Sequence, residues 1–214
     1  MNFSVNCNNS IRLIGSKKIY IDPYEIKEET HDADYIFCTH SHYDHFSPED
    51  IKKVLKNDTK IVTVQDAKLD AEKLVGKENV FIVEPNQNYT IDDISFSTTY
   101  AFNVDKPFHP KDSRWVGYII ELDGTKYYIA GDTDNIPEIR KIIADVAFLP
   151  VGGTYTMDYK EAVDLANVLN VKTVVPTHYG SVAGKKEDGE NFKRLVKNKE
   201  VILFDLRKAK EKLK

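Results

Sequence analysis

The chain has 214 residues and a formal net charge of −4 at pH 7. Its apolar fraction of 41% supports a packed hydrophobic core and argues against a disordered chain. The pI near 5.9 argues against a general nucleic-acid-binding protein, which would carry a basic face. The sequence has no apolar signal segment and no apolar run of membrane-spanning length. With two cysteines, Cys7 and Cys38, we expect reduced thiols in a cytoplasmic protein that folds as one domain over residues 1–214.

Hydrophobic patterns in the first part of the chain predict short strands, with helices between the later ones. The strands are expected over residues 11–14, 18–21, 35–38, 61–64 and 80–83. A helix is expected from Pro48, because Ser47 is a good N-cap and proline suits the first helical position. A second helix is expected over residues 67–75, capped by Asp66 and ended by Gly76.

The second part of the chain predicts a β-rich region and then alternating strands and helices. The strands are expected over residues 94–100, 116–122, 126–130, 146–150, 173–175 and 201–204, and the helices over residues 159–169 and 191–197. Asp123-Gly124 is a strong two-residue hairpin signal, and Asp158 with Glu161 predicts a capping pair. We expect the charged tail from Arg207 to Lys214 to be frayed. Two batches of strands with helices favour two packed sheets covered by helices on their outer faces.

The run His40-Ser41-His42-Tyr43-Asp44-His45 holds three imidazoles and a carboxylate within six residues. Histidine is the commonest ligand of zinc-like metals, and aspartate adds an oxygen ligand. The run follows an apolar strand and precedes a capped helix, so its side chains can point toward one place. A polar loop with chance histidines is the alternative, but the whole chain has only six histidines. The run therefore predicts a metal site.

Two further ligand-type residues follow later strands. Asp132 comes after the strand expected at residues 126–130, and His178 comes after the strand expected at residues 173–175. Taken alone, Asp132 would be interpreted as a turn residue and His178 as structural or exposed. Beside the histidine run, strand ends that face one crevice are the geometry of a metal pocket. Asp22, which follows an earlier strand, is placed to support the ligand histidines from behind.

In this order the residues resemble the metallo-β-lactamase superfamily. The run is similar to that family's His-x-His-x-Asp-His signature, and Gly131-Asp132-Thr133 resembles its later bridging-aspartate motif. The resemblance implies an α/β fold, the four-layer αββα sandwich, with two metal ions at its edge. It also implies the metal ligands, which are His40 and His42 for the first ion, Asp44, His45 and His178 for the second, and Asp132 for both.

The sequence departs from the family pattern at one ligand of the first ion. The family has a histidine between the first motif and the bridging aspartate, whereas Asn103 occupies the expected strand end here. The nearest histidine is His109. We favour His109 as the ligand, because imidazole is a far commoner zinc ligand than an amide. An amide oxygen from Asn103, or a weaker first site, is the alternative.

The resemblance implies a metal-dependent hydrolase in which hydroxide bound by two metal ions cleaves an ester, lactone or phosphodiester bond. Asp44 and Asp132 would be its catalytic carboxylates. The expected ions are zinc, with manganese or iron as alternatives, and the overall pattern is similar to that of ascorbate-phosphate lactonase-like proteins. We expect a small-molecule substrate in contact with Asn103, Tyr155 and Tyr179, and no membrane association. The sequence does not decide whether the protein is a monomer or a homo-oligomer. The competing hypotheses are a non-catalytic metal-binding or sensor protein and an iron-dependent oxidoreductase.

Overall fold

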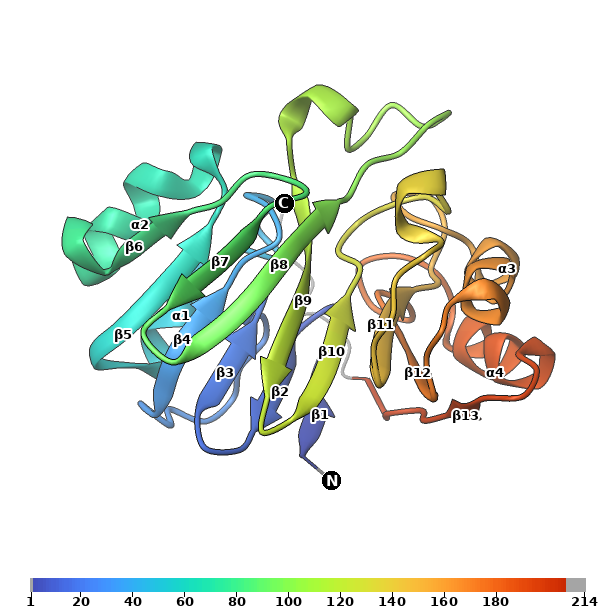
Figure 1. Cartoon of the computed structure of the whole chain (residues 1–214), viewed down its shortest axis with the longest axis horizontal. Helices are drawn as coiled ribbons and strands as arrows, with labels where there is room; N and C mark the ends of the chain where they lie inside the picture. The colour runs from blue at the N-terminus through green and yellow to red at the C-terminus, as the bar shows by residue number, and fades with distance from the viewer. Residues whose placement is uncertain (1, 207–214) are drawn as a thin grey trace.

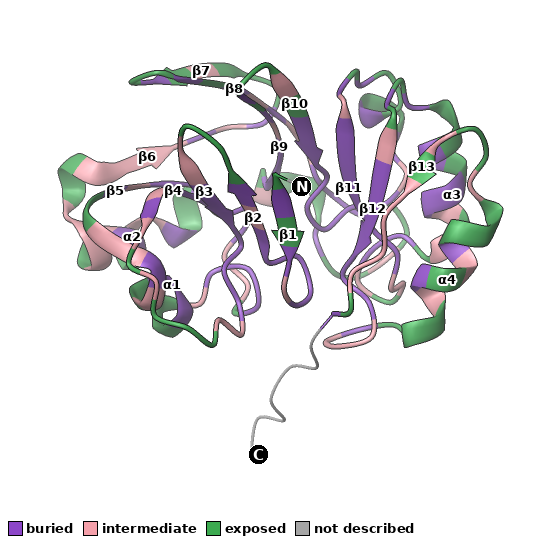
Figure 2. Ribbon diagram, turned by 90° about the horizontal axis from the view of Figure 1, so that it is seen from below, coloured by how far each residue is buried: buried purple, intermediate pink, exposed green. Residues whose placement is uncertain are grey.

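The computed structural model describes residues 2–206, so the tail predicted from Arg207 to Lys214 lies outside the described residues. Its strands form a six-stranded and a seven-stranded sheet that face each other. Helices α1 and α2 cover the outer side of the first sheet, and α3 and α4 cover the second (Figures 1 and 2). These layers confirm the predicted αββα sandwich. Within residues 2–206 the helices are all too short or too polar to cross a bilayer.

The first sheet is antiparallel at one edge and parallel over the rest. Its order is β1 (Phe3–Val5), β2 (Ile11–Ile14), β3 (Lys18–Ile21), β4 (Ala33–Phe37), β5 (Leu55–Thr63) and β6 (Val80–Ile82). Strands β3 to β6 run parallel to one another. Helix α1 (Pro48–Val54) joins β4 to β5, and α2 (Lys68–Val75) joins β5 to β6, as parallel neighbours require.

The second sheet combines an antiparallel meander with a parallel half. Its order is β13 (Glu200–Val201), β12 (Thr173–Thr177), β11 (Val146–Pro150), β10 (Thr125–Ile129), β9 (Val116–Leu122), β8 (Ile94–Tyr100) and β7 (Asn88–Ile91). Strands β10 to β13 are parallel; α3 (Tyr159–Val168) connects β11 to β12, and α4 (Lys186–Leu195) connects β12 to β13. Short 3-10 helices cover Gln65–Ala67, Lys77–Asn79, Lys111–Ser113 and Pro137–Ile139.

The main core lies between the two sheets. Phe37 of the first sheet packs edge-on against Phe96 and Tyr118 of the second, with ring centroids 4.9 and 5.1 Å apart. Phe3 meets Phe148 in the same way at 5.3 Å. Burial of each such side chain stabilises the fold by about 1.5–3 kcal/mol. The packing holds the two sheets in a fixed relation, and so fixes the strand ends that carry the predicted ligands.

Local sequence signals account for several element boundaries. Ser47 accepts a hydrogen bond from the backbone of Asp50 at the start of α1, with Pro48 in the first turn. Asp158 and Glu161 form the predicted capping box at the start of α3. The two-residue loop between β9 and β10 is Asp123-Gly124, with φ of 49° and 76°, as a right-twisted hairpin requires.

Other boundaries differ from the prediction. Strands β1 and β7 were not expected, because one is only three residues long and the other is mostly polar. Helix α4 begins at Lys186 rather than at residue 191, since its first half is charged and contains Gly189. That glycine is needed for packing, because a Cβ there would lie 2.4 Å from the Tyr179 hydroxyl. Strand β13 ends at Val201 rather than at residue 204.

The predicted cap of α2 is wrong. Asp66 does not cap the helix; its carboxylate accepts hydrogen bonds from Ser41 Oγ at 2.7 Å and from Trp115 Nε1 at 2.9 Å. Both donors are tertiary partners that the local pattern does not reveal. Asp66 therefore ties the start of the histidine run to the second sheet.

Candidate metal centre

Five strand ends meet at one edge of the sandwich. Strands β3 and β4 are parallel, and so are β10 and β12 through their shared neighbour β11. Strands β8 and β10 both run antiparallel to β9, so they share one direction. The loops that leave these carboxyl ends carry Asp22, the run from His40 to His45, His109, Asp132 and His178. This is the usual position of a ligand site in layered α/β proteins.

All seven predicted metal-binding side chains lie in one cluster, in which six are buried and His42 is partly exposed. Three overlapping groups have possible ligand atoms within 4.8 Å of one another. The groups are His40, His42 and His109; then His40, His45 and Asp132; then Asp44, His45 and His178. Because the groups share members, the cluster can surround two neighbouring points rather than one.

Asp132 lies at the centre of the cluster. Its Oδ2 is 3.2 Å from both His109 Nε2 and His178 Nε2, and 4.0 Å from His40 Nε2. Its Oδ1 is 3.4 Å from His45 Nε2. His40 and His109 belong to the first group, and His45 and His178 to the third. A carboxylate surrounded by histidines of these two groups is the arrangement that a bridging ligand requires. The predicted role of Asp132 is therefore supported by its position.

Several atoms of the cluster are buried without a hydrogen-bond partner among residues 2–206. They are Nε2 of His45, His109 and His178, and Oδ1 of Asp132. A buried polar atom left without a partner destabilises a fold by about 1–3 kcal/mol, so native proteins rarely retain several together. Coordination to a cation would satisfy all four atoms. Imidazole nitrogen and carboxylate oxygen are donors that suit zinc, manganese or iron, so this set fits divalent metal ions.

Asp22 orients the His45 imidazole through the ring nitrogen that does not face the cluster. It is fully buried, and its Oδ2 accepts a hydrogen bond from His45 Nδ1 at 2.7 Å. Thr39 donates through its backbone and hydroxyl, each at 2.8 Å, and Asn9 donates through its amide at 2.7 Å. A carboxylate at Nδ1 fixes the proton there and leaves Nε2 available as a ligand. Asp22 thus has the position that the sequence predicts.

Asn8 is a supporting residue that sequence reasoning missed. Its Nδ2 donates to Asp44 Oδ2 at 2.8 Å, and its carbonyl accepts from the backbone N–H of His178 at 3.0 Å. Its backbone has a left-handed φ of 52°, which asparagine tolerates better than most residues. One asparagine therefore holds two members of the same ligand group. No local signal singled out Asn8, because the strand before it, β1, is only three residues long.

Trp115 is the second supporting residue that was missed. Its ring centroid lies 4.7 Å from those of both His40 and His42, and 5.2 Å from that of His109. The indole Nε1 donates to Asp66, which fixes the plane of the ring. The tryptophan thus packs against every member of the first ligand group.

The carboxylates of Asp44 and Asp132 give the group of Asp44, His45 and His178 a negative potential. Burial lowers the pKa of His40 well below its ordinary value, and the nearby His45 lowers it further. Burial also lowers the pKa of His45 and His178. In His45 the carboxylates of Asp132 and Asp44 outweigh burial and raise the pKa well above its ordinary value. Asp132 likewise raises the pKa of His178 to about 9. A field that favours the protonated imidazoles equally favours a bound cation.

His109 and Asn103 have different positions. Asn103 Nδ2 donates to the carbonyls of Phe108 at 3.0 Å and Tyr155 at 2.7 Å, and its backbone N–H donates to the His109 carbonyl at 2.8 Å. These bonds close the loop that carries His109 into the cluster. His109 therefore joins His40 and His42 in the first group, whereas the Asn103 amide supports the loop.

A pocket of about 210 Å³ opens onto the cluster. Its lining is His42, Tyr43, Asp44, Phe108, His109, Asp132, Tyr155, His178 and Val182. Tyr155 therefore lies where a substrate contact was expected. Asn103 does not line the pocket.

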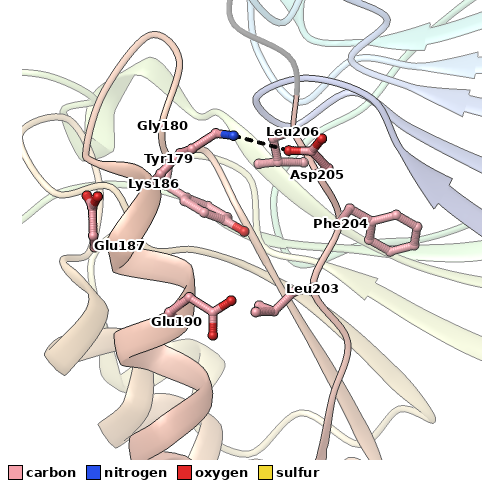
Figure 3. A pocket seen from close by; sticks show the side chains of 9 residues that line it. All are labelled: Tyr179, Gly180, Lys186, Glu187, Glu190, Leu203, Phe204, Asp205 and Leu206. Atoms are coloured by element: carbon pink, nitrogen blue, oxygen red, sulfur yellow. Dashed lines mark hydrogen bonds and ion pairs between the residues drawn. The ribbon is translucent and has the colours of Figure 1, made fainter.

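The expectation for Tyr179 does not hold. Its side chain lines a different pocket, of about 360 Å³, between α4 and residues 203–206, beside the ion pair of Lys186 and Asp205 (Figure 3). Both residues follow the end of β12 at Thr177, and His178 has a left-handed φ of 54°, so the backbone turns at this point. His178 points to the metal-binding cluster, whereas the Tyr179 ring lies against Gly189 of α4.

The comparisons with known proteins agree with this geometry. Residues 9–178 match the family model of the beta-lactamase superfamily domain. A UPF0173 metal-dependent hydrolase of Thermococcus onnurineus is 33% identical over 211 residues, which cover 91% of this chain and 92% of that protein. Another, from Nanoarchaeum equitans, is 32% identical and covers 91% of each chain.

Solved structures give the same result. A metal-dependent hydrolase of Parabacteroides distasonis superposes with a TM-score of 0.80 at 28% identity, covering 96% of this chain and 93% of that one. Igni18, a metallo hydrolase of Ignicoccus hospitalis, shares the fold with a TM-score of 0.74 at 23% identity, covering 94% of each. The fold and the relatives define a metallo-β-lactamase superfamily protein. Within that superfamily the chain belongs to the UPF0173 metal-dependent hydrolases, which confirms the predicted class of enzyme.

Proposed function

We propose that the chain holds two divalent metal ions, zinc in preference to manganese or iron, and hydrolyses an ester, lactone or phosphodiester bond of a small molecule. The observation that carries the proposal is the set of three overlapping ligand groups around Asp132. The unpartnered buried nitrogens of His45, His109 and His178 support it, because ion coordination gives them partners.

The proposed ligands follow from the groups. His40, His42 and His109 would hold the first ion, Asp44, His45 and His178 the second, and Asp132 both. Three protein ligands and an open position are usual for a catalytic zinc ion. When bound, such ions lower the pKa of water and neutralise charge on the oxygen under attack.

The chain's own residues would set the geometry of the reaction. Asp22 holds the proton on His45 Nδ1, so that Nε2 faces the centre. Asn8 occupies one oxygen of Asp44, which fixes the direction of that carboxylate. Tyr155 lines the pocket beside the cluster and would contact the substrate. The pocket opening beside Asp132 admits the substrate to the face of the cluster.

Elemental analysis joined to hydrolysis assays tests the proposal. Protein purified without chelator should contain close to two equivalents of transition metal and hydrolyse 4-nitrophenyl acetate or bis(4-nitrophenyl) phosphate. Chelator treatment should remove both properties, and added zinc should restore them. Two bound metals without turnover would favour a sensor role, and bound iron with a visible absorption band would favour an oxidoreductase. A metal content near zero after reconstitution would contradict the two-metal site.

A further inference from the structure

The wall of the pocket that is not formed by the predicted ligands is apolar and aromatic. It consists of Tyr43, Phe108, Tyr155 and Val182. The rings of Phe108 and Tyr155 meet edge-on with centroids 4.8 Å apart. Phe108 remains 42% exposed, so part of its ring is available to a ligand that enters the pocket.

The pocket has no lysine or arginine in its lining, as far as residues 2–206 show. The lysines of the adjoining loop are paired elsewhere. Lys106, two residues before Phe108, pairs with Asp134, and Lys111 donates to Glu138 at 2.9 Å. An entering group therefore meets aromatic rings and the metal-binding cluster, but no arginine or lysine from this part of the chain.

These observations separate the bond types of the proposed function, on which the following inference rests. We propose that the substrate is a neutral carboxylic ester or lactone that carries a small aryl or branched alkyl group, rather than a phosphodiester. Kinases and GTPases add lysine or arginine side chains to the metal ions that neutralise the phosphoryl oxygens, whereas a carbonyl develops charge on a single oxygen. Aromatic walls recognise an uncharged aryl or alkyl group through area and edge contacts.

The size of the pocket restricts the substrate further. A volume of about 210 Å³ is below the roughly 300–1,000 Å³ of pockets for drug-sized ligands, so the substrate is a small one.

In the proposed reaction, the oxygen of water bonds to the carbonyl carbon and the carbon–oxygen bond to the alcohol breaks. The proton from water goes to the departing alkoxide, so the products are a carboxylic acid and an alcohol, with no change of oxidation state.

Paired probes with similar outlines test the inference. The zinc-loaded protein is assayed with 4-nitrophenyl acetate, which is neutral, and with methyl 4-nitrophenyl phosphate, which is a monoanion. We expect a higher kcat/KM for the ester. Phe108→Ala should raise the KM for the ester about tenfold through loss of aromatic contact. Val182→Arg should favour the phosphodiester by a similar factor, and the exposed-leucine control Leu69→Ala should change neither probe. A higher kcat/KM for the phosphodiester in the unaltered protein would overturn the inference.

A binding measurement distinguishes failure of this inference from failure of the proposed function. Metal-free protein is examined by ligand-observed NMR with methyl benzoate. We expect saturation transfer to methyl benzoate that weakens in Phe108→Ala and is unchanged in the control Leu69→Ala. Absence of transfer to methyl benzoate would overturn the neutral-substrate inference, as would binding that Phe108→Ala leaves unchanged. Absence of turnover with two metals bound would overturn the hydrolase proposal alone.

Discussion

Two aspartates of this protein, Asp32 and Asp132, differ in the hydrogen bonds that their carboxylate oxygens accept. Around Asp32, both carboxylate oxygens have partners: Arg12 and Lys18 donate to Oδ2 at 2.6 and 2.9 Å, and Tyr20 donates to Oδ1 at 2.7 Å. Around Asp132, Oδ1 makes no hydrogen bond within residues 2–206, although histidine nitrogens lie 3.2–3.4 Å from the carboxylate.

The difference shows which observation identifies a functional site. Both aspartates have a lowered pKa, although burial alone would raise the pKa of each. Hydrogen bonds and cations lower the pKa of Asp32 to about 2. The imidazoles lower the pKa of Asp132 well below its ordinary value. A shifted pKa alone therefore does not separate them. The carboxylate oxygens do: both oxygens of Asp32 accept hydrogen bonds, whereas Oδ1 of Asp132 accepts none within residues 2–206.

Asp132→Ala should have the largest effect on activity. Both ligand groups lose the shared carboxylate, so we expect hydrolysis to fall by at least ~10³-fold, since metals supply several kcal/mol of charge stabilisation. The metal content should fall below one equivalent, while the far-ultraviolet circular dichroism stays unchanged because no apolar group is lost. Asp164→Ala, at an exposed position of α3, serves as the control. If Asp132→Ala kept two metals and full turnover, the contrast with Asp32 would have no functional meaning.

His109→Ala and Asn103→Ala test the first ligand group. The structure leads us to expect that His109→Ala lowers the metal content from two equivalents toward one, because the second group keeps its own three ligands. Asn103→Ala should reduce activity about tenfold with less metal loss, as expected for a residue that supports a ligand loop. Elemental analysis of both variants decides between them. Loss of one metal in Asn103→Ala but not in His109→Ala would reverse the assignment.

Asp22→Asn should have a smaller effect on the second ligand group. An amide holds the His45 ring less firmly and no longer favours the proton on Nδ1, so we expect a 10–100-fold weaker metal affinity. Competition with a fluorescent zinc chelator measures the change. The single tryptophan, Trp115, lies against the first group and provides an internal signal for occupancy there. An affinity equal to that of the unaltered protein would show that Asp22 has only a structural role.

The fold was predictable where local signals are strong. Asp123-Gly124, the Asp158–Glu161 box and Ser47-Pro48 each set a boundary through bonds within a few residues. Strands β1 and β7 were not predictable, because each is too short or too polar to show alternation and is stabilised by its neighbour in the sheet. The start of α4 was hidden for a similar reason, since its charged first turn gives no apolar period.

The site was predictable to the extent that its residues have a rare chemistry in a known order. The run from His40 to His45 shows this, and Asp132 and His178 gain meaning only beside it. Asn8 and Trp115 have ordinary residue types, so their contacts with the cluster depend on tertiary structure. The direction of Tyr179 depended on the left-handed backbone turn at His178 after β12, which no local pattern reveals.

Asp32→Asn is expected to change stability and leave hydrolysis unchanged, which is the reverse of Asp132→Ala. The folded-state pKa of Asp32 is about 2, below the ordinary value of 3.8, so the charged carboxylate stabilises the fold at pH values above 3.8. We expect Asp32→Asn to lower the free energy of unfolding by ~2 kcal/mol at pH 7, since each pKa unit corresponds to about 1.4 kcal/mol. This difference should shrink as the pH falls from 4 toward 2, where the carboxylate takes up a proton in the folded state as well. Urea unfolding of chelator-treated protein at pH 7 and pH 3 measures the effect without metal linkage. The control is Asp70→Asn, because Asp70 forms an exposed ion pair with Lys73 on α2; it should lower the free energy of unfolding by less than ~0.5 kcal/mol. A difference between Asp32→Asn and the unaltered protein that is absent at pH 7, or that grows on acidification, would contradict the structural role assigned to this cluster.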